Sequence, residues 1–83
     1  MTKTHAAARI RSYVADNFLY MRPGLALADT DSLLATGVID SMGVIELITF
    51  VSDELGVAIA DEDITEQIIG TIDALAAYVA ARA

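Results

Sequence analysis

The sequence offers few side chains that could carry out a reaction. It contains no cysteine and one histidine, His5, close to the N-terminus. Ser41 could belong to a Ser-His-Asp triad only if His5 acted as its base. Around this serine, Ile39-Asp40-Ser41-Met42-Gly43 matches only half of a Gly-x-Ser-x-Gly nucleophile elbow, and no strand is expected before it. Intrinsic catalysis is therefore not expected, and neither is a zinc site built from cysteine and histidine.

Common binding motifs for phosphate and calcium are also absent. Gly37 and Gly43 form no Gly-x-Gly-x-x-Gly pattern, and no lysine follows them. The run Asp61-Glu62-Asp63 lacks the alternating spacing, the turn glycine and the terminal glutamate of an EF-hand loop. We expect no metal site. The remaining candidate for a functional site is the stretch Gly37–Met42, at which a helix begins.

The first of the elements that must position Ser41 is a helix followed by a long loop. A helix is predicted from about Thr4 to Leu19 by four apolar residues at helical spacing, Ile10, Tyr13, Val14 and Phe18. Arg22-Pro23-Gly24 should end it. The loop that follows is longer than most connections, and ordered loops of this length are often functional. Four of its leucines can pack against a core: Leu25, Leu27, Leu33 and Leu34.

The second helix has the clearest limits. Asp40 or Ser41 supplies an N-cap, and Gly56 offers a C-terminal stop after Leu55. At about 100° per residue, one side collects apolar residues that should face the core, Val44, Ile48, Val51 and Leu55. The opposite side carries Met42, Glu46, Thr49 and Asp53. The helix should therefore present an acidic stripe that begins with an exposed methionine directly after Ser41.

The last third of the chain predicts a link, a short helix and a longer one. Val57-Ala58-Ile59 should be extended without a partner strand, and Asp61–Glu66 should form a short helical turn. Thr71 is the expected N-cap of the final helix, whose apolar face is Ile72, Leu75, Ala76 and Val79. We therefore expect one all-α domain over residues 1–83. It should be a small four-helix bundle with three longer helices, one short helix and a long loop between the first and second helices.

Charge is distributed unevenly along the 83 residues, whose formal net charge is −7. Residues 1–28 hold four basic residues against one acid, a net of +3, and residues 29–83 hold eleven acids against Arg82, a net of −10. Such a field repels nucleic acid and attracts basic protein surfaces. The longest apolar run, Ala74–Ala81, falls short of the roughly 20 residues of a membrane span. Arg9 and Arg11 lie where a signal peptide would be apolar, so we expect a cytoplasmic domain. We also expect this domain to be a monomer.

Over nearly its whole length the chain resembles the acyl carrier proteins, the small four-helix carriers of phosphopantetheine. The resemblance covers Leu33-Leu34, Asp40-Ser41, Glu46-Leu47, Leu55-Gly56-Val57, the Asp61–Ile64 turn, and Thr71-Ile72 with Leu75 and Tyr78-Val79. Asp-Ser followed by an apolar residue is common by itself. The same tripeptide is a specific sign of this resemblance when it stands at the start of the second of three long helices in an acidic chain of this size.

The resemblance implies a carrier that is modified and loaded by other enzymes. In the family, a phosphopantetheinyl transferase moves 4′-phosphopantetheine from coenzyme A onto the serine that matches Ser41. Acyl groups then ride on this arm as thioesters. Further partners would be a loading ligase or transferase, and a synthase or acyltransferase with a basic docking patch, in fatty-acid, polyketide or related biosynthesis. The residues implied in partner recognition are Asp40, Met42, Glu46, Asp53 and Glu54.

The cargo is left open by two departures from the usual motif. Met42 stands where leucine is usual, and Gly43 where an acid often follows. The run Asp-Ser-Met-Gly also resembles the D-alanyl and other aminoacyl carrier proteins, which an adenylating ligase loads. The residues are compatible as well with a protein-binding bundle that is never modified, and with an enzyme that has an unrecognised acidic site. Residues that could line a cleft for an acyl chain, or simply pack in the core, are Ile45, Leu47, Phe50, Ile59, Ile64, Ile68 and Ile72.

Overall fold

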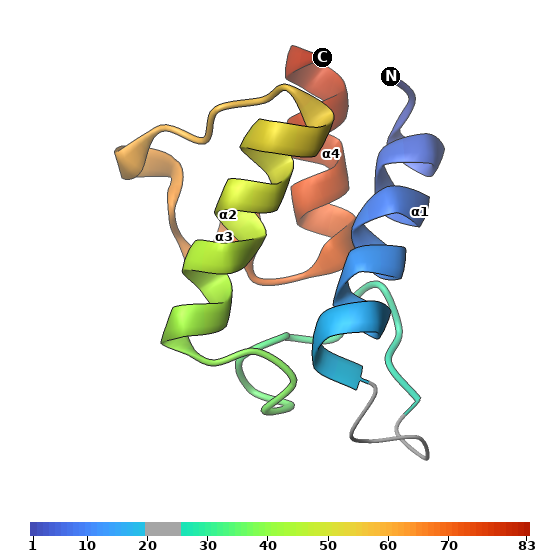
Figure 1. Cartoon of the computed structure of the whole chain (residues 1–83), viewed down its shortest axis with the longest axis vertical. Coiled ribbons are helices and arrows are strands. Elements are labelled where there is room, and N and C mark those ends of the chain that lie inside the picture. The colour runs from blue at the N-terminus through green and yellow to red at the C-terminus, as the bar shows by residue number, and fades with distance from the viewer. Residues whose placement is uncertain (20–25) are drawn as a thin grey trace.

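The computed structural model describes residues 1–19 and 26–83, which form helices and connecting segments without a strand (Figure 1). The elements are α1 (Lys3–Val14), a π-helical turn η1 (Ala15–Leu19), α2 (Ser41–Leu55), a 3-10 turn η2 (Asp61–Asp63), α3 (Glu66–Ile69) and α4 (Ile72–Arg82). The expected all-α bundle, with a long connection before α2, is confirmed. The predicted helix stop at Arg22-Pro23-Gly24, and Leu25 after it, lie outside the described residues.

The limits of α2 and the start of α4 follow from local capping. The Asp40 carboxylate accepts the Gly43 N–H at 2.8 Å, and Gly56 closes α2 with a left-handed φ of 71°. Thr71 accepts the Ala74 N–H at 3.0 Å at the start of α4. These bonds satisfy backbone groups that a helix end leaves without a partner. The predicted ends are therefore confirmed.

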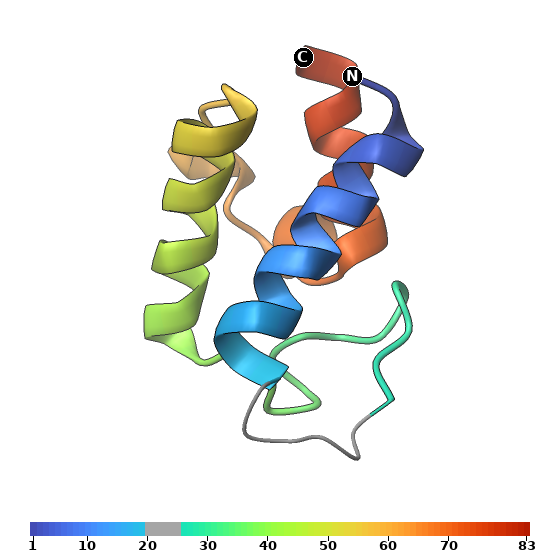
Figure 2. The same cartoon turned by 45° about the vertical axis from the view of Figure 1, so that its right-hand side comes forward.

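The core lies where α1 and α4 pack along each other, with α2 beside them (Figures 1 and 2). Ile10 and Val14 of α1 are completely buried there, as is Val79 of α4. The apolar face predicted for α4 is buried in full. In the link after α2, Val57 and Ile59 are buried and Ala58 is exposed, as its extended shape requires.

Two details of the predicted elements differ in the structure. Val51 and Leu55 of the predicted core face of α2 are buried, and Val44 and Ile48 are half-buried and pack against the core. The fully buried side is completed instead by Gly43 and Leu47. The short helix is also displaced along the chain. A 3-10 turn occupies Asp61–Asp63, the backbone extends at Thr65, and the α-helical turn begins only at Glu66.

The turn η2 is tied to α4 by the side chain of Asp63. Asp63 accepts a hydrogen bond from the Tyr78 hydroxyl at 2.8 Å and lies 3.9 Å from Arg82, which stacks over the Tyr78 ring. A carboxylate held in this way anchors η2 to α4. Ile64 and Thr65 are not helical, and the chain turns again at Glu66.

The long connection is tied to the helices at both of its described ends. Arg11 of α1 forms an ion pair with Asp29, and the Asp73 N–H donates to the Asp29 carbonyl at 2.9 Å. Farther along, the Leu33 N–H donates to the Gly70 carbonyl at 2.8 Å. Leu33 is buried, as expected, but Leu34 is 46% exposed. These contacts fix the position of the start of α2 beside α3.

Candidate functional site

Ser41 is the first residue of α2, and its side chain is exposed. The turn before it contains Gly37, whose φ of 74° suits glycine, and ends on the buried pair Val38 and Ile39. The Ile39 N–H donates to the Leu33 carbonyl at 3.1 Å. The buried turn before it and the Asp40 cap fix the position of Ser41 at the N-terminus of α2, where the residue is exposed.

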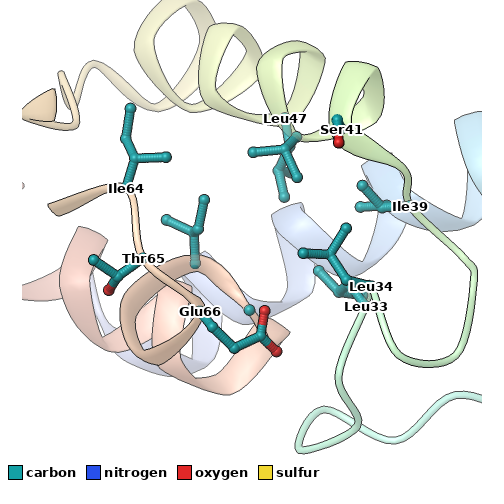
Figure 3. Close-up of a pocket in the computed structure, with 11 residues that line it drawn as sticks. Leu33, Leu34, Ile39, Ser41, Leu47, Ile64, Thr65 and Glu66 are labelled. Atoms are coloured by element: carbon teal, nitrogen blue, oxygen red, sulfur yellow. The ribbon is translucent and has the colours of Figure 1, made fainter.

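A cavity of about 270 Å³ opens beside Ser41 (Figure 3). It lies between the end of the long connection, the first turns of α2, and α3. Most of its wall is apolar, and several wall residues also belong to the buried core. The lining residues are Leu33, Leu34, Ile39, Ser41, Val44, Leu47, Ile64, Thr65, Glu66, Ile69 and Gly70. The cavity thus joins an exposed hydroxyl to an apolar interior.

The structure divides the seven candidate cleft residues among different environments. Leu47 and Ile64 line the cavity. Ile59 and Ile72 are buried in the core, and Ile68 packs against it. Ile45 and Phe50 border a separate hollow between α1 and α2. The wall residues Leu33, Leu34 and Ile39 precede α2, and no periodicity within a helix could have assigned them to a cavity.

The implied recognition residues do not form one uniform patch. Met42 is 67% exposed, and Glu46 and Asp53 are exposed on the same helix. Glu54 is exposed too, but it lies 4.0 Å from Arg9 of α1. Asp40 is engaged as the cap of α2. We refer to Met42, Glu46, Asp53 and Glu54 as the acidic surface.

An aromatic cluster beside the acidic surface was not expected from the sequence. The rings of Tyr13 and Phe50 stack at a centroid distance of 4.2 Å, and Phe18 meets Tyr13 edge-on at 5.9 Å. Burial, and secondarily the negative charge of Glu46, raises the pKa of the Tyr13 hydroxyl above its usual value. Ile45, 59% exposed, borders the same hollow. Tyr13 and Phe18 belong to the predicted pattern of the first helix, but their contact with α2 depends on packing.

Gly43 has a packing role that its position in the motif does not reveal. A Cβ atom at this position would lie 2.9 Å from both the Ile39 Cγ2 and the Phe18 Cε1. The first turn of α2 therefore approaches η1 so closely that a larger residue would force side chains apart. This contact accounts for a glycine inside a helix that would otherwise favour alanine.

In the ranges 1–19 and 26–83 no group of three or more His, Cys, Asp and Glu side chains is placed to hold a metal ion. Among the same residues, no helix has the length and apolar character needed to cross a membrane.

This arrangement suits a group linked through a phosphate. Ser41 Oγ is accessible, the N-terminus of the 15-residue helix favours a phosphodiester anion, and the cavity gives an attached chain an apolar surface. The match to known families agrees with this chemistry. The model of the phosphopantetheine attachment site family matches residues 8–79. No curated protein sequence matches the chain significantly.

A match over 8–79 covers most of the 83 residues, including every element from the middle of α1 to α4. Members of the family carry 4′-phosphopantetheine as a covalently attached group. Carrier domains of this kind generally do not catalyse reactions themselves. The chain belongs to the phosphopantetheine attachment site family, and its cofactor is a covalently bound 4′-phosphopantetheine.

Proposed function

We propose that Ser41 is the attachment point of 4′-phosphopantetheine and that the protein carries acyl groups between partner enzymes. The observation that carries this proposal is the exposed Ser41 hydroxyl at the capped start of α2, beside an apolar cavity. When attached, the group supplies a terminal thiol that holds a carboxylic acid as a thioester. Because the chain has no cysteine, this thiol would be its only one.

The attachment step is a phosphoryl transfer carried out by a separate transferase. Ser41 Oγ forms a bond to the phosphorus next to pantetheine in coenzyme A. The bond between that phosphorus and the oxygen that bridges the two phosphates breaks, and adenosine 3′,5′-bisphosphate leaves with the bridging oxygen. The hydroxyl proton passes to a base or water on the transferase. Asp40 and the helix fix where Ser41 stands, and the reaction with coenzyme A fits the expected cytoplasmic location.

The partners would recognise the acidic surface together with Asp40. Met42 provides an apolar contact, while Glu46 and Asp53 provide exposed charges close to the modified residue in sequence. Basic patches on a transferase, a loading ligase and a synthase or acyltransferase would complement them. Fatty-acid, polyketide and related biosynthesis are the pathways that use such carriers. A second candidate is an aminoacyl carrier loaded by an adenylating ligase, favoured by a carboxylate in the wall of the cavity, Glu66.

The first test is the intact mass of the protein before and after incubation with coenzyme A, magnesium and a broad-specificity phosphopantetheinyl transferase. We expect a gain of one phosphopantetheinyl group and one titratable thiol. Ser41→Ala should show neither. Ser52→Ala is the matched control, because Ser52 is an exposed serine of the same helix. Wild-type protein that is folded but gains no mass would favour the unmodified protein-binding bundle.

A further inference from the structure

The wall of the cavity beside Ser41 includes one acidic side chain, Glu66. Among its eleven lining residues only Glu66 carries a charge, and the rest are apolar except for Ser41, Thr65 and Gly70. Figure 3 shows Ser41 and Glu66 coming from different helices on opposite borders of the cavity. A group attached to Ser41 and folded into the cavity would therefore meet a negative charge.

Two contacts hold the Glu66 carboxylate in place. Ser32 donates a hydrogen bond to Glu66 Oε1 at 2.7 Å, and the same Ser32 hydroxyl accepts the Ala35 N–H at 3.1 Å. Gly70 leaves the space that the carboxylate occupies, because a Cβ atom there would lie 2.6 Å from Glu66 Oε1. The position of the charge is thus set by the end of the long connection and by the residue that follows α3.

The charge of Glu66 is not neutralised by the basic side chains in the described parts of the chain. Lys3, Arg9, Arg11 and Arg82 each pair with another acid, and those pairs involve Asp73, Glu54, Asp29 and Asp63. The wall around the carboxylate includes the buried residues Leu33, Leu47 and Ile69, whereas Glu66 itself is exposed. The carboxylate therefore acts on a charged cargo from the solvent-accessible edge of the cavity, where the attraction between an exposed pair of charges is modest.

We infer that Glu66 is a specificity-determining residue that selects the charge of the cargo held in the cavity. It favours an acyl group that bears an ammonium, such as an aminoacyl group, tolerates a neutral one and disfavours one that bears a carboxylate. Ser32 and Gly70 act as positioning residues for this carboxylate. The inference rests on the proposed attachment at Ser41, and it deepens that proposal by naming the class of cargo.

Three cargoes of matched length test the inference. A phosphopantetheinyl transferase can load the protein directly from β-alanyl-, butyryl- or succinyl-coenzyme A, whose acyl groups end in an ammonium, a methyl group and a carboxylate. Loading is confirmed by intact mass. The rate of thioester hydrolysis and the shift in melting temperature relative to the unloaded holo-protein are then measured for wild type and Glu66→Gln. Comparing the two proteins with the same cargo cancels the intrinsic reactivity of each thioester.

We expect Glu66→Gln to speed hydrolysis of the β-alanyl thioester about threefold, because the cargo is no longer retained. Hydrolysis of the succinyl thioester should slow by a similar factor, and that of the butyryl thioester should not change. The melting-temperature shifts should follow the same order. Glu62→Gln is the matched control, since Glu62 is an exposed acid outside the cavity wall. Ser32→Ala should reproduce part of the Glu66→Gln effect without removing the charge.

Equal effects of Glu66→Gln on all three cargoes would overturn the inference, because a purely structural role does not depend on cargo charge. The absence of any effect would overturn it as well. Failure of the proposed function is seen at an earlier step, as a lack of mass gain at Ser41. The two failures are therefore distinguishable.

Discussion

The hydroxyl of Tyr13 reports the local environment where α1 meets the acidic surface. Its pKa is raised above 10.0 by burial and by the charge of Glu46. We expect Glu46→Gln to lower this pKa, because the repulsion between the tyrosinate and the glutamate is removed. A pH titration of the tyrosine rings followed by NMR measures the change. Asp53→Asn serves as the control, and an equal decrease in that variant would contradict the specific role of Glu46.

The same raised pKa has a consequence for stability. Above about pH 10, an unfolded chain loses the Tyr13 proton while the folded chain still retains it. The folded state then binds more protons than the unfolded state, so this residue makes the free energy of unfolding fall as the pH rises. Tyr13→Phe should therefore show a smaller loss of stability between pH 9 and pH 11, about one pH unit on either side of the ordinary value.

Gly43 sets the distance between η1 and the start of α2. Gly43→Ala gains up to about 1 kcal/mol of helix propensity but overpacks Phe18 and Ile39, which typically costs about 1–3 kcal/mol. We expect a net loss of about 1 kcal/mol in the free energy of unfolding, measured with urea. The loss should shrink when the ring is removed by Phe18→Leu. Ser52→Ala, an exposed change in the same helix, should not destabilise. A more stable Gly43→Ala protein would refute this account of the glycine.

At the scale of the element, α2 depends on Asp40 for its first turn. Asp40→Ala removes the acceptor of the Gly43 N–H and should cost about 1 kcal/mol of stability. Asp40→Asn keeps an oxygen acceptor and should stay close to wild type. Urea unfolding measures both. If Asp40→Asn were as unstable as Asp40→Ala, the negative charge and not the cap would be the stabilising feature.

The same pair of variants separates capping from recognition. With stability retained in Asp40→Asn, any decrease in the rate of modification at Ser41 reports the missing charge at the transferase interface. The surrounding elements limit this effect to the site, because Val38 and Ile39 are buried and hold the preceding turn. The role that we expect for the long connection in modification is therefore to fix the position of Ser41.

At the scale of the whole molecule, the uneven charge should govern association with partners. Raising the salt from about 0.05 M to about 0.5 M shortens the Debye length severalfold and weakens attraction between the acidic surface and a basic patch. We expect the KM of the transferase for this protein to rise several-fold while kcat changes little. Glu46→Gln should raise KM even at low salt. Asp16→Asn, which changes an exposed acid in the basic N-terminal part, is the control. A KM independent of salt would contradict electrostatic docking.

Features determined by neighbouring residues were accessible from the sequence. The ends of α2 depend on Asp40 and Gly56, and the start of α4 depends on Thr71, because capping bonds join residues three or four positions apart. The family resemblance likewise rests on short motifs spread from Leu33 to Val79, and the match over residues 8–79 confirms it. The sequence by itself thus determined the class of fold, the cofactor and the residue we propose for its attachment.

Features that depend on distant residues were decided only by the tertiary structure. The cavity draws its wall from the long connection, α2 and α3, and Glu66 is held by Ser32, thirty-four positions away. The buried side of α2 also includes Gly43 and Leu47, which the predicted apolar face did not contain. Helical periodicity carries no information about such neighbours. The physical reason is that a cavity and a fixed charge arise from the placement of separate segments, which is determined when the whole core packs.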